Sequence, residues 1–427
     1  MISMTHSLFN AGLARLPRAE IYISAFAVAK SILFIFQSPV IMIRQTVTSL
    51  VNDSQSYYRV RKFVFYLSLI VLGLYALFVF TELSGWVLKN IMGLNGDILK
   101  AAVVMLKVFT IFLMSISLRE FMRGLAIKFN LNELITLGTV SRIIYVTTMV
   151  IFINKFSMLQ PAVVAGLLLA GAGFFEGLTV FLGTKISIKN IAHKLNIHKK
   201  SRKKVVPQKI TGTIIYNYYF PLLLTAFIRQ LATPIINTGL GNTINPEIAL
   251  SVFAVGLGLG NIAISPVIFY HQLPIYFLET NFKINKKAVI KFTLYLGLFL
   301  TAIVAILAFS GLGYYILINW IGAGEEISGL ALDVLKIMTF LPLIMISREY
   351  FWGLFMEKHL TKYVSRGKTI NLITLTLTIF IVTFLKPDNP AITGITAKVA
   401  AEGAELIYLY YINKRVLDNE GNLCISS

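Results

Sequence analysis

Three basic residues lie inside apolar stretches of the sequence with no acidic residue three or four positions away. They are Lys30, Arg142 and Arg229. A charged side chain at membrane depth is costly, so it usually faces a partner or a water-filled cavity and marks a functional position. A fixed positive charge in a cleft of low dielectric constant favours an anionic ligand. These three residues therefore predict a binding site for a small anion.

Two acidic residues, Glu176 and Glu405, lie in comparable apolar stretches. Each carboxylate could bind and release a proton, which would make it a coupling group. Alternatively, each could stay paired with a basic residue of another helix, because unpaired charge is expensive in the membrane. The sequence favours pairing and leaves coupling open.

Two Arg-Glu steps, Arg119 with Glu120 and Arg348 with Glu349, recur 229 positions apart. Neighbouring residues on a helix do not face each other. Each step is therefore predicted to bond to other helices or loops and to act as a strut or a gate.

Two further pairs of opposite charge have helical spacing. Asp333 and Lys336 are three positions apart, and Lys398 and Glu402 are four apart. Residues at these separations share a helix face. We predict two local ion pairs.

The 229-residue separation belongs to a duplication that covers the whole chain. Residues 26–28 and 38–41 read Phe-Ala-Val and Ser-Pro-Val-Ile, and the same letters recur 227 positions later at residues 253–255 and 265–268. Beyond a loop the separation becomes 229 and holds to the end of the chain. A unit of several helices written twice in the same direction is a recurrent plan of membrane transporters.

Matched residues of the two copies include candidates for binding and for bending. Asn10 and Asn237 are matched polar residues, and we include both in the predicted substrate site. Pro39 and Pro266 are matched prolines, and proline inside a helix removes a backbone hydrogen bond and kinks the helix. They predict paired hinge points, or bends that packing alone requires.

The three cations Lys30, Arg142 and Arg229 are not matched across the duplication. Their counterparts are Leu257, Asn371 and Ile2. Residues that differ between the copies are better candidates for ligand contacts than residues that hold a shared frame. The alternative is that long basic side chains reach toward the membrane interface.

The composition predicts an all-α polytopic membrane protein. Of 427 residues, 56% are hydrophobic and 14% are charged, whereas a soluble domain has about 25% charged residues. Eleven apolar runs are long enough to cross a bilayer, which takes about 20 residues. They lie near residues 21–45, 62–81, 98–118, 131–153, 160–184, 210–240, 246–278, 288–316, 327–347, 368–385 and 389–412.

The duplication predicts twelve spans in two parallel six-helix repeats. Residues 1–13 align with the last part of the run at 210–240, so the first helix is expected to be truncated at its N-terminus. The sequence predicts four parts: an N-terminal bundle at 1–184, a basic linker at 185–209, a C-terminal bundle at 210–412 and a tail at 413–427.

Basic residues predict the orientation. With the linker placed in the cytoplasm, 26 Lys and Arg residues fall in cytoplasmic loops and six on the other side. This positive-inside bias predicts a multi-pass plasma-membrane protein with a cytoplasmic C-terminus. The basic loops are expected to contact anionic lipid headgroups rather than nucleic acid.

Enzymatic motifs are missing from the sequence. It has no Ser, His and Asp constellation, no phosphate-binding glycine loop with its lysine, and no clustered metal ligands. The single cysteine, Cys424, excludes an internal disulfide. We predict that the protein is not an enzyme and needs no cofactor or metal.

Several residues of the second half carry a family resemblance. They are Tyr219, Phe220, Pro221, Pro234, Ile235, Asn237, Pro342, Arg348, Gly353, Met356, Thr361, Gly403 and Glu405. With the two halves and the basic linker, they resemble the multidrug/oligosaccharidyl-lipid/polysaccharide (MOP) exporter superfamily, which includes the MATE exporters. Within it, the second half is most similar to the progressive ankylosis (ANK) family.

The resemblance implies a MATE-like fold and a monomeric transporter whose two bundles rock to give alternating access. It also implies export of a small polyanion of the pyrophosphate, nucleotide or citrate class. Three alternatives stay open from the sequence. They are a flippase for lipid-linked oligosaccharide or polysaccharide, a cation-coupled multidrug exporter, and a scaffold that binds a partner through its basic linker.

Overall fold

The computed structural model describes residues 2–153, 159–187, 211–358 and 360–417, and their regular structure is helical. The predicted linker and tail fall largely outside these ranges. The first half contains α1 (Ile2–Leu13), α2 (Ala19–Leu50), α3 (Ser54–Phe80), α4 (Leu83–Trp86), α5 (Gly96–Lys128), α6 (Asn132–Ile151) and α7 (Pro161–Ser187). The second contains α9 (Gly212–Gly241), α10 (Pro246–Ile264), α11 (Gln272–Phe309), α12 (Leu312–Tyr315), α13 (Glu325–Met338), α14 (Leu341–Glu357), α15 (Thr361–Leu385) and α16 (Ile392–Ile412).

The duplication predicted from the sequence is confirmed helix by helix. The short helices α4 and α12 start 229 residues apart, and each continues into a π-helical turn, Val87–Ile91 and Ile316–Ile321. α5 and α13 also start 229 residues apart. α1 has 12 residues and corresponds to the last part of the 30-residue α9.

All eleven apolar runs are helical, but they differ in how they could cross a membrane. Within the described residues, nine helical stretches are long and apolar enough to span a bilayer, and α13 with α14 forms a tenth candidate bent by 41°. The eleventh run is α16, whose three charged residues lower its apolar character. Pro342, at the start of α14, accounts for the bend, and α5 has no proline at the matching position.

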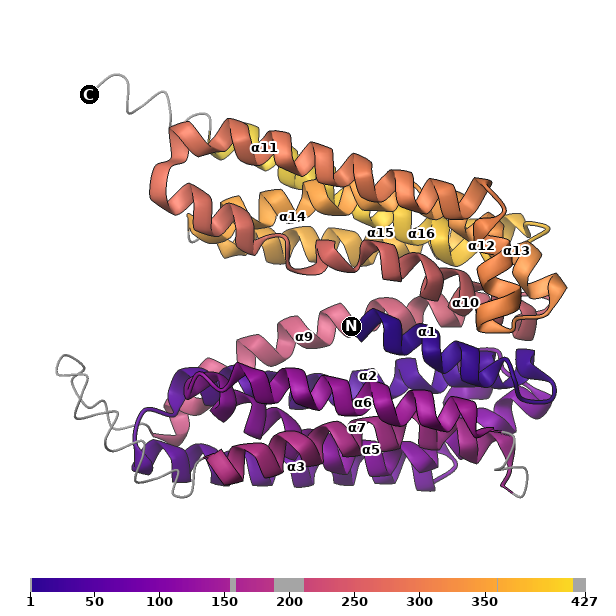
Figure 1. The fold of residues 1–427 in the computed structure, drawn as a ribbon, viewed down its shortest axis with the longest axis horizontal. Helices are drawn as coiled ribbons and strands as arrows, with labels where there is room; N and C mark the ends of the chain where they lie inside the picture. Colours follow the sequence, from indigo (N-terminus) through magenta and orange to yellow (C-terminus); the bar gives the residue numbers. More distant parts are fainter. Residues whose placement is uncertain (1, 154–158, 188–210, 359, 418–427) are drawn as a thin grey trace. The chain divides into compact units, whose positions relative to one another are not determined.

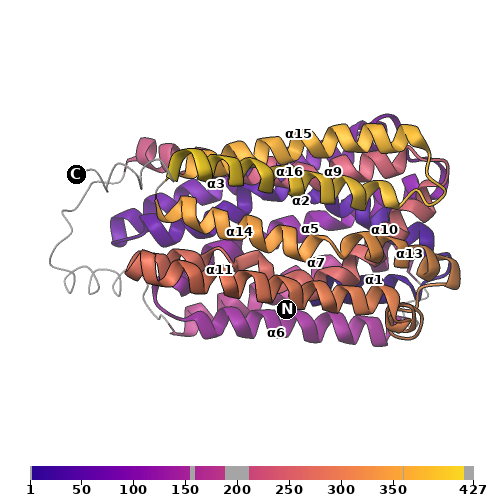
Figure 2. The same ribbon diagram turned by 90° about the horizontal axis from the view of Figure 1, so that it is seen from above.

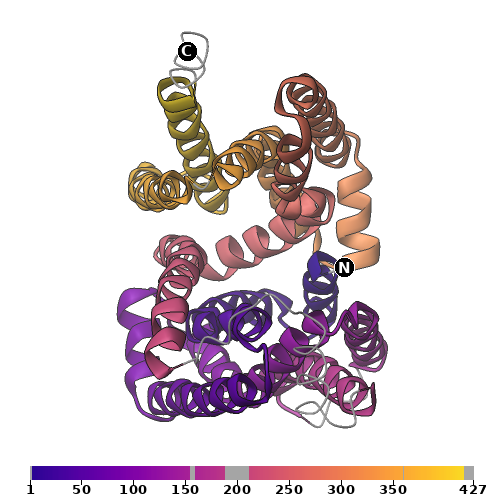
Figure 3. The same cartoon turned by 90° about the vertical axis from the view of Figure 1, so that its left-hand side faces the viewer.

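Contacts divide the chain into two compact units. The first unit comprises Met1–Arg18, Val28–Ile91 and Asn95–Gln230, and the second comprises Ala19–Ala27, Met92–Leu94 and Leu231–Ser427. In the first, α7 packs against α5 and α6, and α3 against α5 (Figure 1); most helices of this unit are seen nearly end-on in Figure 3. In the second, α16 packs against α14 and α15, and α11 against α14 (Figure 2). The bundle limits predicted at residues 184 and 210 stay predictions.

One face of α3 carries large exposed apolar side chains, as a lipid-facing helix does. Phe65 is 60% exposed, Ile70 60% and Leu77 65%. The opposite face contains Tyr75, which is fully buried and donates its hydroxyl to the carbonyl of Leu106 on α5 at 2.7 Å. The polar tip of this buried ring is therefore satisfied by backbone.

The matched prolines share one hydrogen-bonding device but differ in helix continuity. Proline cannot donate to the carbonyl four residues earlier. Ser38 donates its hydroxyl to the Ile35 carbonyl at 2.7 Å, and Ser265 donates to the matching Ile262 carbonyl at 2.8 Å. α2 continues through Pro39, whereas α10 ends before Pro266 and a 3₁₀ turn, Ser265–Phe269, follows.

Two matched glycines permit close helix contact next to the polar residues described below. A Cβ atom on Gly124 of α5 would lie 2.7 Å from Val47 Cβ and 2.8 Å from the Arg44 carbonyl oxygen of α2. A Cβ atom on Gly353 would lie 2.7 Å from the His271 carbonyl oxygen. Only glycine allows the backbones to approach this closely, as in other membrane helix contacts.

We predict that Gly124→Ala lowers the free energy of unfolding by about 2 kcal/mol, because the added methyl must displace α2 from α5. Gly73→Ala on α3 is the matched control, since a Cβ atom there would meet nothing within 4 Å. Denaturant titration in detergent micelles measures both. Equal stability of the two variants would contradict the close contact.

Candidate functional site

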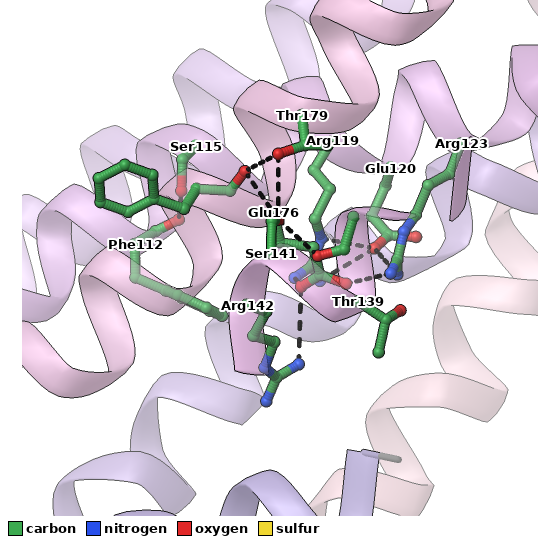
Figure 4. A network of polar contacts seen from close by, with 12 residues as sticks. Phe112, Ser115, Arg119, Glu120, Arg123, Thr139, Ser141, Arg142, Glu176 and Thr179 are labelled. Carbon is green, nitrogen blue, oxygen red and sulfur yellow. Dashed lines mark hydrogen bonds and ion pairs between the residues drawn. The ribbon is translucent and has the colours of Figure 1, made fainter. Parts of the chain in front are cut away.

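Glu176 of α7 is the centre of a buried group of ion pairs in the first unit (Figure 4). Arg119 of α5 donates from Nη1 to Glu176 Oε2 at 2.6 Å, and Arg123, one turn later, donates to Oε1. Arg142 approaches from α6 and places Nη1 3.6 Å from Oε2. One carboxylate therefore joins three helices, and the predicted pairing of Glu176 is confirmed.

Glu120 is the second carboxylate of the group. Arg119 donates from Nε to Glu120 Oε1 at 3.1 Å, and Arg123 donates from Nη1 to the same oxygen at 3.4 Å. Arg44 of α2 places Nε 3.6 Å from Oε2. We call the six residues the first-repeat cluster: Arg44, Arg119, Glu120, Arg123, Arg142 and Glu176.

The expectation that the residues of an Arg-Glu step face apart is wrong here. The guanidinium of Arg119 presents donors in several directions, so it reaches both its neighbour Glu120 and Glu176 on the next helix. The expected bond to another helix is present as well. Whether the step acts as a gate stays a prediction.

The first-repeat cluster carries more positive than negative charge. Its four arginines share two glutamates, which leaves a formal net charge of two positive units in the cluster. Arg119, Arg123 and Arg142 expose only 7%, 8% and 11% of their side chains. Among the described residues, three buried arginine Nε groups have no hydrogen-bond acceptor: those of Arg123 and Arg142 in this cluster and that of Arg348 in the second unit. Since buried donors are nearly always satisfied, these N–H groups are suited to an additional anion.

Lys30 and Arg229 extend the positive charge beyond the cluster. The charge of Arg142 acts on the Lys30 ammonium, and the charge of Arg44 acts on the Arg229 guanidinium. All four groups are cations, so each of the two electrostatic interactions is repulsive. Of the three cations predicted from the sequence, the structure brings Arg142 into the cluster, and the other two interact electrostatically with arginines of the cluster. Their role in binding an anion stays a prediction.

Arg348 of α14 is the centre of the corresponding group in the second unit. It donates to Glu349, its neighbour in sequence, and to Glu402 of α16. Its Nη1 lies 3.9 Å from Glu405 Oε2. His271 adds a contact between its Nδ1 and Glu349 Oε2 at 2.6 Å.

Glu405 of α16 accepts three further hydrogen bonds, all from α14 and α15. Trp352 donates from Nε1 at 3.0 Å, Lys368 from Nζ at 2.8 Å and Asn371 from Nδ2 at 2.9 Å. The predicted pairing of Glu405 is therefore confirmed. We call the eight residues the second-repeat cluster: His271, Arg348, Glu349, Trp352, Lys368, Asn371, Glu402 and Glu405.

The two clusters share a frame and differ in charge. Arg119, Glu120 and Glu176 are matched by Arg348, Glu349 and Glu405 in the duplication. The other cluster positions are changed, and the first residue of each pair belongs to the first repeat: Arg44 and His271, Arg123 and Trp352, Thr139 and Lys368, Arg142 and Asn371, and Gly173 and Glu402.

Charge is balanced in the second repeat. Arg348 and Lys368 face three glutamates, and the charge of Lys398 also acts on Glu402. At three positions the first repeat has arginine where the second repeat has another residue, and the first repeat lacks a counterpart of the third glutamate, Glu402. The shared frame therefore does not require the positive surplus of the first-repeat cluster.

The other predicted residues are placed as follows. Asn237 of α9 is buried and donates from its side-chain Nδ2 to the backbone carbonyl of Ala27 of α2 at 3.1 Å. Asn10 is buried as well. Their assignment to a substrate site stays a prediction. The local pair of Lys336 and Asp333 is confirmed at 3.0 Å.

Arg44 and Arg123 were not identified from the sequence. Arg123 had a usable signal, because it lies three positions after Glu120 on the same helix. Arg44 had none, since it meets Glu120 only through the packing of α2 against α5. In the described part of the chain, no group of three His, Cys, Asp or Glu side chains converges as metal ligands would.

Solved structures with a similar fold are membrane transporters. An inward-facing structure of a multidrug resistance MATE family transporter of the MOP superfamily has a TM-score of 0.74 at 13% identity, covering 98% of this chain and 96% of that one. The lipid II flippase MurJ, in an inward closed conformation, has a TM-score of 0.67 at 15% identity, covering 97% and 86%. The eukaryotic MATE transporter AtDTX14 has a TM-score of 0.51 at 12% identity, covering 96% and 93%.

The chain has the fold of these proteins, which confirms the predicted MATE-like fold class. No protein-family model matches the chain, and no curated protein matches it by sequence. The resemblance to the ANK family therefore stays a prediction.

We predict that Glu176→Gln lowers the free energy of unfolding by about 3 kcal/mol, because three buried arginines lose a shared carboxylate. Glu405→Gln is the matched control. Its cost is smaller because Arg348 keeps Glu349 and Glu402, and because Lys368, which loses its carboxylate, is 20% exposed. Adding Arg142→Gln to Glu176→Gln restores part of the loss by removing one buried charge. Chemical unfolding in detergent measures all three, and equal costs for the two single variants would contradict the charge difference.

Proposed function

We propose that the protein is a membrane transporter for a small polyanion, which binds at the first-repeat cluster together with Lys30 and Arg229. The observation that supports the proposal most directly is the surplus of buried positive charge. Buried charge that is not neutralised destabilises the protein. An excess of buried positive charge is therefore expected where an anionic ligand binds and neutralises it. The balanced second-repeat cluster lacks this feature.

Arginine suits the proposed substrate class. A guanidinium group binds phosphate and carboxylate oxygens through two parallel hydrogen bonds. Arg123 and Arg142 each have an Nε–H group without an acceptor among the described residues. Pyrophosphate, nucleotides and citrate offer several anionic oxygens each and are the substrates that we propose.

The fold supports transport by alternating access. The similar structures are those of MATE transporters and of MurJ, and the chain has nine helical stretches suited to a bilayer in its described part. We propose a plasma-membrane location with the basic loops and the C-terminus in the cytoplasm, as the distribution of basic residues indicates. A coupling role for Glu176 and Glu405 stays a prediction, since both carboxylates are held in ion pairs.

A flippase for a lipid-linked oligosaccharide is the second candidate. The diphosphate group of such a substrate would present the same kind of oxygens to the same arginines. MurJ, whose name gives lipid II as its substrate, shares the fold over 97% of this chain. Export of cationic drugs has less support, because the surplus positive charge would repel them.

The proposal is tested by uptake of labelled pyrophosphate, ATP and citrate into proteoliposomes that contain the purified protein. Arg142→Asn copies the residue of the second repeat, and we expect it to fold. We predict that it reduces uptake of the transported anion about tenfold or more, because a charge-assisted contact is lost. Lys30→Gln and Arg229→Gln are expected to reduce uptake in the same direction.

Lys336→Gln is the control, since it removes one positive charge from an exposed pair in the second unit. Unchanged uptake in all three cation variants would overturn the proposal. If none of the three anions is transported and a labelled polyprenyl diphosphate sugar is flipped, the second candidate replaces the first.

A further inference from the structure

The first unit has a groove on its surface between α3, α5 and α7. This groove has a volume of about 860 Å³, within the range of roughly 300–1,000 Å³ found for ligand sites. Apolar side chains form most of it, among them Phe65 of α3, Met114 and Leu118 of α5, and Phe181 of α7. Phe65 and Met114 are 60% and 61% exposed, so the groove is open to the surroundings of the helices.

Three basic residues line the groove at the end where α3 begins and α7 ends. They are Arg61, Lys62 and Lys185. Within the described chain, none of the three lies within ion-pair distance of a carboxylate. Lys62 Nζ lies 5.9 Å from the ring centroid of Tyr66, and Lys185 Nζ lies 5.7 Å from that of Phe181. Three positive charges without acidic partners among the described residues therefore lie at one end of an apolar groove.

Aromatic residues indicate where this end lies in a bilayer. Tyr57 and Tyr58, near the start of α3, line the same end of the groove. Tyrosine is enriched at the level of lipid headgroups, where its ring is apolar and its hydroxyl is wet. The basic residues are therefore at headgroup level, and the apolar lining continues toward the hydrocarbon.

We propose that this groove binds one phospholipid with an anionic headgroup, whose phosphate contacts Arg61, Lys62 and Lys185 and whose acyl chain lies along Phe65, Met114 and Leu118. A free phosphate ion would leave the apolar lining exposed, and a zwitterionic phospholipid would add its own cation beside the three basic residues, whereas an anionic phospholipid would not. The proposal does not rest on the substrate proposed above.

The second repeat offers an internal comparison. Lys291 and Lys414 are the counterparts of Lys62 and Lys185, but Ile290 takes the place of Arg61. A pocket at a different place on that unit has a volume of about 400 Å³ and is lined by Leu273, Phe277, Ala288, Val289 and Phe292, without a basic residue. The set of three basic residues is therefore complete only in the first repeat.

The test is retention of lipid by the purified full chain, measured by native mass spectrometry after incubation with equal amounts of phosphatidylglycerol and phosphatidylcholine. The wild-type protein is expected to retain phosphatidylglycerol preferentially. We predict that the variant combining Arg61→Gln, Lys62→Gln and Lys185→Gln loses this preference about tenfold or more, because each basic residue near the membrane surface attracts anionic lipid. Lys291→Gln, the matched control, is expected to retain it.

A second variant separates the groove from general surface charge. Leu118→Trp fills the groove and leaves all three cations in place, so it is expected to lose the bound phospholipid. Inorganic phosphate is not expected to displace the lipid. The proposal is overturned if the wild type shows no preference, if the triple variant keeps it, if Leu118→Trp retains the lipid, or if phosphate alone displaces it.

Discussion

Buried arginine–glutamate contacts between neighbouring helices are the interaction on which the two units depend. Glu176 and Arg119 join α7 to α5, and Glu405 and Glu402 join α16 to Arg348 of α14. Removing such charges from water is expensive, and only mutual pairing with hydrogen bonds offsets the cost. Helix positions are therefore restricted to arrangements that keep these charges together.

Duplication of this frame allowed the two copies to diverge in charge without losing the fold. The second copy balances its basic residues with Glu402 and packs Trp352 where the first has Arg123. The first copy accumulates arginines around two carboxylates, and Arg142 is also 6.0 Å from the ring centroid of Phe9 on α1. The proposed anion site lies in the first repeat alone because the two repeats differ in local charge while they share the same arrangement of helices.

Contact with lipid or with other helices explains why the helices differ in the strength of their apolar pattern. α3 exposes large apolar side chains, and its apolar run was evident. α16 carries Lys398, Glu402 and Glu405, because it lies against α14 and α15 and supplies charge to the second-repeat cluster. High hydropathy is typical of helices that contact lipid. It is therefore a weak predictor of a membrane helix such as α16, whose charged side chains form part of a buried polar cluster.

The sequence by itself determined the helical class, the duplication, the matched Ser-Pro steps and the central Arg119, Glu120 and Glu176, because apolar runs and internal matches are properties of the chain order. Only the tertiary structure decided that Arg44 and Arg142 join these residues from α2 and α6. Helical periodicity relates residues within about a turn of one another. Contacts between side chains of different helices depend on packing, which the order of residues along one helix does not contain.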